Sequence, residues 1–405
     1  ANTATASRFT GIKIKRNLVE NPFLRVKFYP DGSFDLFDKI GKRQFKRCHI
    51  FEDTEDIGDA YDYAPAKRRQ IVSSRGKKGT LRLVHKSPVA AEFEVRMSLS
   101  LPAAFDRDRR RRSNKTVRCP LTIRFTITAT APYLSIHTTF HNSAHDHRLR
   151  VQFTSPIATT TSLAGQQFFV IERPLKKTPG KNWRQPPSPT EPMQHFCAIG
   201  DRKGGLAILV QGLYEYEARR EGRGTALLLT LLRSVGWLSR DDLATRPGHA
   251  GPFLPTPEAQ CLGRQEFRYA IMPYTGNWQK ADLPLAAQQF RTPLLSKLCL
   301  GPGGALPADF SLFHIEPKSI VVTAIKKSEQ RDTIIVRLFN ASALRFKGKL
   351  SWGLPVARAW KLSLLEERLE ETTVFSNSRI DIDFPAWRIV TLELEMSKSV
   401  LAMSP

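Results

Sequence analysis

Apolar and polar residues alternate along much of the chain. Between residues 91 and 101, Phe93, Val95 and Met97 occupy every second position, and polar side chains fill the positions between them. Residues 121–129 repeat the pattern. Period-two alternation with many β-branched residues is typical of a strand that buries one face. We therefore expect strands over both ranges and over further runs of the same kind at 23–29, 33–38, 134–140, 149–153, 168–171 and 206–210.

Helical periodicity is scarce by comparison. The best amphipathic stretch lies at 283–298, where Pro284 and Pro293 weaken it. We find no regular alternation of strands with helices and no repeat of fixed period. These observations predict an all-β protein in which antiparallel sheets pack as sandwiches.

A Gly- and Pro-rich break at 299–307 divides the chain. After it, a new series of strands is predicted at 319–325, 333–339, 348–352, 357–364 and 379–395. We place the boundary near residue 305, which gives a large β domain at 21–304 and a small sandwich at 305–405, a normal size for such a fold. Residues 174–192 carry six prolines and are expected to form a long loop of the large domain.

Composition narrows the class of protein. Of the 405 residues, 41% are hydrophobic, enough for a well-packed core of two or three domains. No apolar run approaches the roughly 20 residues of a membrane span, so no membrane partner is expected. The five scattered cysteines form no CxxC pair, which favours buried free thiols and a reducing, cytoplasmic compartment. The opening ANTATASRF lacks an initiator Met and signal-peptide features, so we expect a fragment or a processed chain.

The formal net charge of +24 raises the question of nucleic-acid binding. The one dense basic run is DRDRRRR at 106–112. Phe105 directly precedes it, and the run itself contains no aromatic residue. Nucleic-acid binders usually interleave basic and aromatic side chains on one element. A solvated loop is therefore favoured, a phosphate- or polyanion-binding patch is the alternative, and the role of Arg107 to Arg112 stays open. We do not expect a nucleic-acid partner.

An acidic, tyrosine-containing segment at 51–65 is the first candidate site. It contains six carboxylates, Glu52, Asp53, Glu55, Asp56, Asp59 and Asp62. Three interpretations stay open: oxygen ligands for a hard cation, a carboxylate pair for acid/base catalysis, or a polar loop that presents Tyr61 or Tyr63 to a sugar.

Two further segments carry candidate chemistry. In FHNSAHDHRLRVQF at 140–153, Asp146 has Arg148 and Arg150 to pair with, so a turn held by ion pairs is favoured over a His/Asp metal site. A nearly unbroken apolar strand ends at Arg233. Because a buried charge is unfavourable, this side chain must bind an acidic or hydroxyl partner or lie at an edge of the sheet. A long loop follows, and such loops often carry binding residues. The motifs of serine hydrolases, zincins, P-loop and Rossmann proteins are absent.

Five ordered segments together resemble a known family. They are GDAYDYAP at 58–65, HNSAHDHRLRVQF at 141–153, GLYEYE at 212–217, LTLLRSVGWLSRDDLATRPGHAGP at 229–252 and TPEAQCLG at 256–263. The chain resembles, over residues 20–396, the C-terminal half of the α-mannosidases of glycoside hydrolase family 38. It is most similar to the bacterial branch that includes mannosylglycerate hydrolases.

The resemblance implies a fold and an activity. The large domain would be a galactose-mutarotase-like supersandwich followed by the small C-terminal β-sandwich. The complete enzyme would be a retaining α-mannosidase whose two catalytic aspartates, and whose zinc or other divalent metal, lie in an N-terminal barrel. Residues 1–20 would be a tail or linker from that barrel. The resemblance thus implies no catalytic residue, no metal site and no cofactor in this chain, which should be inactive alone.

The resemblance also implies substrate contacts from the β region. Tyr61 matches a tyrosine near the bound sugar, and Arg233 is the best match for an arginine that approaches it, with Arg246 as second choice. Asp59 would orient Tyr61 or meet the sugar. The expected partners are an α-mannoside or mannosylglycerate-like substrate, the barrel of the same polypeptide and a second copy in a homo-oligomer. A stand-alone carbohydrate-binding or architectural β module is the alternative.

Overall fold

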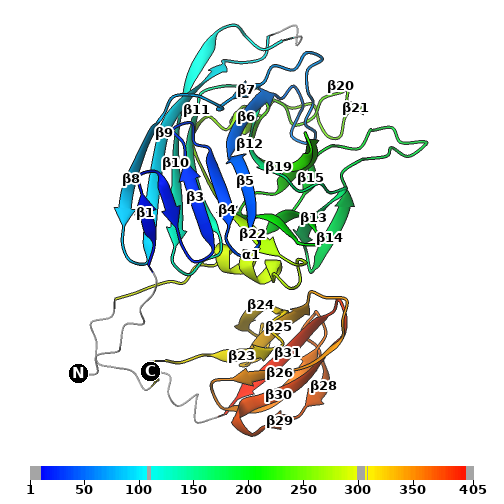
Figure 1. Cartoon of the computed structure of the whole chain (residues 1–405). Helices are drawn as coiled ribbons and strands as arrows, with labels where there is room; N and C mark the ends of the chain where they lie inside the picture. The colour runs from blue at the N-terminus through cyan, green and yellow to red at the C-terminus, as the bar shows by residue number, and fades with distance from the viewer. Residues whose placement is uncertain (1–10, 107–110, 299–305, 308, 398–405) are drawn as a thin grey trace. The chain divides into compact units, whose positions relative to one another are not determined.

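The computed structural model describes residues 11–106, 111–298, 306–307 and 309–397. The chain divides into two compact units. Unit 1 comprises residues 1–165 and 171–281, and unit 2 comprises 166–170 and 282–405. The predicted boundary near residue 305 falls at 299–305, outside the described residues, and stays a prediction. Strands joined in antiparallel sheets dominate both units, which confirms the predicted all-β class (Figure 1).

Unit 1 is built from three main sheets. The first consists of β1 (Lys13–Lys15), β2 (Leu18–Glu20), β3 (Leu24–Phe28), β4 (Phe34–Asp38) and β5 (Arg43–Cys48). The second consists, in spatial order, of β14 (Phe169–Pro174), β13 (Thr161–Gln166), β16 (Phe196–Asp201), β17 (Gly204–Gln211), β22 (Gly263–Thr275), β11 (Leu134–Asn142), β10 (Thr116–Thr128), β9 (Ala90–Pro102) and β8 (Thr80–Lys86). The third consists of β15 (Glu191–Pro192), β18 (Glu215–Glu221), β19 (Gly224–Ser234), β12 (His147–Ser155), β6 (Ile50–Glu55) and β7 (Val72–Ser73).

The core of unit 1 is formed by the alternating apolar positions. On β9 and β10, Phe93 pairs with Phe125 and Val95 with Ile123, and all four are buried. Phe28 from the first sheet stacks on Phe125 with a centroid distance of 4.8 Å. One apolar cluster therefore joins side chains from all three sheets.

Strand β12 of the third sheet is buried on both faces, and this places the candidate site. On its central strand β12, Leu149, Val151 and Phe153 belong to the apolar cluster. Because neighbouring side chains of a strand point to opposite faces, Arg148 and Arg150 lie on the other face, yet both are buried. We call this the outer face of the third sheet.

Unit 2 begins with α1 (Leu283–Arg291) and continues as two small sheets. The predicted helix at 283–298 ends early because Thr292 precedes Pro293, and the residue before a proline disfavours helix. One sheet contains β23 (Phe313–Glu316), β26 (Phe346–Trp352), β30 (Arg379–Phe384) and β29 (Val374–Phe375). The other contains β24 (Ile320–Lys327), β25 (Ile334–Asn340), β31 (Ile389–Met396), β27 (Val356–Leu362) and β28 (Arg368–Thr372). The predicted strand at 379–395 is thus two strands, β30 and β31.

The cysteines of the described residues are free and mostly buried. Cys48, Cys119 and Cys197 are buried free thiols, Cys261 is half-buried, and Cys299 lies outside the described residues. Burial raises the pKa of the Cys48 thiol to about 12, so this side chain behaves as an inert apolar group. In the part of the chain that the structure describes, no helix has the length and apolar character needed to cross a membrane.

Candidate functional site

The loop that follows β6 is shaped around the carboxylate of Asp59. Its Oδ1 accepts hydrogen bonds from the backbone N–H groups of Tyr61 at 3.0 Å and Asp62 at 2.9 Å, which closes a tight turn. Gly58 is required in this turn because a Cβ there would lie 1.9 Å from the carbonyl oxygen of Asp62. The turn leaves the Tyr61 side chain 53% exposed at its tip. We call residues 56–66 the tyrosine loop.

Arg246 holds the tyrosine loop from a second segment of the chain. It lies in the short ribbon of β20 (Asp242–Leu243) and β21 (Arg246–Pro247) and bonds both Asp59 and Asp62. Burial alone would raise the pKa of Asp59, but hydrogen bonds from Arg246 and from backbone amides outweigh burial and lower it. The ring of Tyr61 lies 6.0 Å from the guanidinium carbon of Arg246.

Arg233, at the end of β19, fastens the other side of the loop. Its Nε donates to Asp56 Oδ2 at 2.7 Å, and its Nη2 donates to the Asp59 carbonyl oxygen at 2.9 Å. Asp56 is buried, and burial raises the pKa of its carboxyl despite the neighbouring charge of Arg233. Of the alternatives that the sequence left open for Arg233, an acidic partner, a hydroxyl partner or an edge, the structure shows an acidic partner, Asp56.

The four residues predicted to contact substrate gather in this one cluster. Asp59 bonds Arg246 directly, Arg233 reaches the backbone of Asp59, and Tyr61 lies over Arg246. Gly251 leaves room for Tyr61, since a Cβ there would lie 2.7 Å from its hydroxyl oxygen. Geometry alone does not test their role toward a sugar, which stays a prediction.

Aromatic residues that sequence reasoning missed border the tyrosine loop. The rings of Trp237 and Phe253 stack at 4.3 Å with an interplanar angle of 7°, and Phe253 is 53% exposed. Trp237 joins the loop through its carbonyl oxygen, which accepts a hydrogen bond from Ala60. A pocket of about 190 Å³ lies beside them and is lined by residues that include Gly58, Trp237 and Arg240. The Gly/Pro/Arg composition of residues 234–260 indicated a loop but gave no signal for this stack.

Most acidic residues of the 51–65 segment are neutralised by arginines rather than arranged around a cation. The pairs are Glu52 with Arg150 and Arg219, Asp53 with Arg112, Asp56 with Arg233, Asp59 with Arg246 and Asp62 with Arg246. Within residues 11–106, 111–298, 306–307 and 309–397, no group of three or more His, Cys, Asp or Glu side chains is placed to hold a metal ion.

Two sequence interpretations need correction in detail. Asp146 does not pair with Arg148 or Arg150; its Oδ1 accepts from Gln260 Nε2 at 2.8 Å, because Asp146 lies in a turn while both arginines point to the outer face. Arg112, the last residue of the basic run, is not solvated but buried against Asp53. Residues 107–110 of that run lie outside the described residues.

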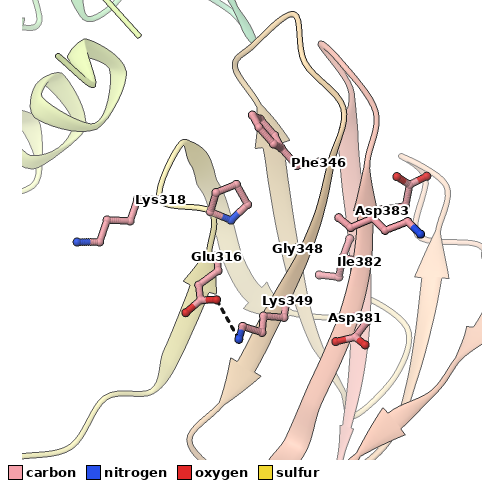
Figure 2. A pocket seen from close by; sticks show the side chains of 10 residues that line it. Glu316, Lys318, Phe346, Gly348, Lys349, Asp381, Ile382 and Asp383 are labelled. Carbon is pink, nitrogen blue, oxygen red and sulfur yellow. Dashed lines mark ion pairs between the residues drawn. The ribbon is translucent and has the colours of Figure 1, made fainter. Parts of the chain in front are cut away.

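A larger pocket in unit 2 does not contain the predicted residues. It measures about 820 Å³ and lies along β23, β26 and β30, where Lys349 pairs with Glu316 at 3.0 Å (Figure 2). Among the described residues that line it, Phe346 is the only aromatic one. This pocket offers paired surface charges and one ring, so the tyrosine loop remains the better candidate.

Comparison with known proteins relates most of the chain to one family. Residues 19–244 match the model of the glycosyl hydrolases family 38 C-terminal domain, and residues 319–392 match that of the glycosyl hydrolases family 38 C-terminal beta sandwich domain. The chain is 27% identical over 396 residues to the "Putative mannosylglycerate hydrolase" of Halalkalibacterium halodurans, covering 94% of this chain and 42% of that protein. It is 29% identical over 270 residues to alpha-mannosidase 2C1 of Mus musculus, covering 65% of this chain and 23% of that protein.

A solved structure supports the same relation. An alpha-mannosidase from Enterococcus faecalis V583 superposes with a TM-score of 0.81 at 26% identity, covering 94% of this chain and 42% of that one. The chain thus spans less than half the length of these relatives. The family match extends over more than half of the chain and includes the tyrosine loop, β12 and β19. The chain therefore belongs to glycoside hydrolase family 38, as the C-terminal region of an α-mannosidase-like protein.

Proposed function

We propose that the chain is the β portion of a retaining α-mannosidase and that its tyrosine loop completes a sugar site formed with an N-terminal catalytic barrel. The observation that carries this proposal is the exposed Tyr61, held at the tip of a loop by Asp59, within the region that matches the family. The names of the mannosylglycerate hydrolase and α-mannosidase relatives support an α-mannoside as the substrate class.

The hydrogen bonds divide the cluster into contact and support residues. Tyr61 presents a ring and a hydroxyl that can both donate and accept, as sugar hydroxyls require. Arg233 uses Nε and Nη2 within the protein, and no described residue accepts from its Nη1, so we propose Nη1 as the donor to a sugar oxygen. Arg246 has its donors engaged by Asp59, Asp62, Gly248 and Arg240. We therefore assign Tyr61 and Arg233 to the sugar, and Arg246 and Asp59 to positioning the loop.

The reaction of the assembled enzyme would be a double displacement. Two carboxylates about 5 Å apart form and then hydrolyse a mannosyl-enzyme through an oxocarbenium-like transition state. Those carboxylates are assigned to the barrel. A divalent metal would polarise and fix the sugar hydroxyls there. The described residues of this chain do not fit such a metal, so their part is to orient the sugar ring and exclude water.

Removal of the Tyr61 hydroxyl in the complete polypeptide tests the proposal. Because one neutral hydrogen bond contributes about 0.5–1.5 kcal/mol, Tyr61→Phe should lower kcat/KM on a short α-mannoside roughly three- to tenfold. Tyr214→Phe is the matched control, since Tyr214 is 64% exposed elsewhere in unit 1. Kinetics that do not change on Tyr61→Phe would reject the contact.

The alternative, a stand-alone carbohydrate-binding module, predicts a different result. The isolated chain would then bind mannose or mannosylglycerate without a barrel, and Tyr61→Ala would abolish that binding. A composite site predicts no measurable binding by the isolated chain. Calorimetric titration of the isolated chain separates the two functions.

A further inference from the structure

A cluster of buried hydrogen-bond donors lies on the outer face of the third sheet. Arg148 on β12 has no exposed surface, and no described residue accepts a hydrogen bond from its Nε, Nη1 or Nη2. Thr54 stands directly opposite on β6, and its hydroxyl is also buried without a partner, as is Nε of Arg150. Leaving such buried groups unsatisfied is unfavourable, so the cluster calls for an acceptor.

The neighbouring carboxylates do not supply that acceptor. Glu215 Oε1 lies 3.8 Å from Nη1 of Arg148, beyond hydrogen-bond distance, and accepts from Thr230 Oγ1 at 2.6 Å. Glu52 and Glu217 both bond Arg150. Burial, and then the charge of Arg150, lower the pKa of Arg148 to about 10, which leaves it cationic at neutral pH.

Tyr63 covers Arg148 from the solvent side. Its ring centroid lies 3.4 Å from the guanidinium carbon, and its hydroxyl accepts a hydrogen bond from the exposed Arg69 at 3.2 Å. Tyr63 belongs to the tyrosine loop and not to a strand. Movement of the ring therefore gives up its contact with the Arg148 guanidinium and a solvent-exposed hydrogen bond, but breaks no bond of the sheet.

We propose that Arg148, Thr54 and Arg150 form a binding site for a small oxyanion, a carboxylate or a phosphate group, which enters when the ring of Tyr63 moves aside. The planar guanidinium of Arg148 can donate two parallel hydrogen bonds to such a group. The Thr54 hydroxyl and Nε of Arg150 can supply further donors. Arg148 also stands directly opposite Arg233 in the β12–β19 ladder, so a bound anion would lie beside the proposed sugar contact. The site goes beyond the glycosidase proposal and does not depend on it.

Calorimetric titration at constant ionic strength tests the site. We expect saturable binding of glycerate or inorganic phosphate by the chain, and none of uncharged glycerol. The anion that binds identifies the group as a carboxylate or a phosphate. Arg148→Gln should weaken binding at least about tenfold, because charge-assisted hydrogen bonds are lost. Arg223→Gln, an exposed arginine of the β18–β19 turn, should leave it unchanged.

A second variant keeps the test decisive if Arg148→Gln fails to fold. Tyr63→Ala removes the cover and should tighten binding of the same anion, since the ring no longer has to move. The proposal is overturned if neither the wild-type chain nor Tyr63→Ala binds either anion saturably, which would mean that solvent water satisfies the cluster. Equal affinity of a folded Arg148→Gln variant would overturn it as well.

Discussion

Replacing Asp59 by Asn removes the charge around which the tyrosine loop is built. The Asn can keep its carbonyl oxygen toward the N–H groups of Tyr61 and Asp62. Its amide NH₂ then faces two donors, the backbone N–H of Arg240 and the guanidinium of Arg246, where the carboxylate accepted from both. Two favourable contacts thereby become donor–donor contacts in a fully buried position.

The loss of these two contacts sets the expected change in the free energy that holds the loop in place. Breaking one side of a buried ion pair costs about 3–5 kcal/mol. Detachment of the loop alone can relieve the conflict, so we expect a loss of about 3 kcal/mol in the free energy that holds the loop in place. Asp62→Asn is the matched control, because Asp62 is 25% exposed, bonds Arg246 with one oxygen and should cost less than about 1 kcal/mol.

Hydrogen exchange of the amides of residues 57–64 measures this free energy. In Asp59→Asn these amides should exchange about a hundredfold faster, the factor that corresponds to about 3 kcal/mol. Since the pKa of Asp59 is lowered in the folded state, the stabilisation is present above the ordinary carboxyl pKa near 4 and is lost as the pH falls through the lower folded value. Equal exchange in both variants would refute the central role of Asp59.

Two further predictions concern groups away from the loop. His49 contacts Gly32 and Tyr269, and burial lowers its pKa to about 4. Between pH 6.5 and 4 the unfolded chain therefore binds more protons than the folded chain. The free energy of unfolding should fall by about 3 kcal/mol as the pH drops through this window. Urea unfolding at several pH values should show a flatter pH dependence for His49→Gln; an unchanged slope would assign the effect to other groups. In unit 2, buried Glu393 accepts hydrogen bonds from Arg331, Arg368 and Thr333, which outweigh burial and lower its pKa to about 2. Glu393→Gln should cost about 3 kcal/mol in urea unfolding, whereas exposed Glu370→Gln should cost less than about 0.5 kcal/mol, and equal losses would contradict the assignment.

The sequence predicted best those elements whose own residues carry the pattern. Strands β9 and β10 alternate because one face is buried, so their positions could be inferred within a few residues. The two-residue strands β7, β15, β20, β21 and β29 are too short to carry a period and were not expected. The prediction of a single strand over 379–395 was wrong, because Pro385 and the left-handed backbone of Trp387 separate β30 from β31.

Partners of charged residues were predictable in kind but not in identity. The long apolar run before Arg233 required an acidic or hydroxyl partner, or an edge, and the partner, Asp56, lies 177 positions away along the chain. The local pairing of Asp146 with Arg148 was wrong because Asp146 lies in a left-handed turn just before β12, where the alternation of the strand does not direct its side chain. Arg148 gave no local signal, since its environment is formed by β6, β12 and the tyrosine loop together.

The pairing of Asp59 with Arg246 has a consequence for how the chain folds. The two residues are separated by 187 positions, so the segment that forms the turn does not contain the side chain that pairs with Asp59. Contacts of such long range form late, after the strands between them have found their partners. During synthesis the loop would leave the ribosome well before the arginine that fixes it. A truncated chain ending before Arg246 would keep β6, the loop and its bonds to Arg233, but Asp59 would lack its guanidinium partner.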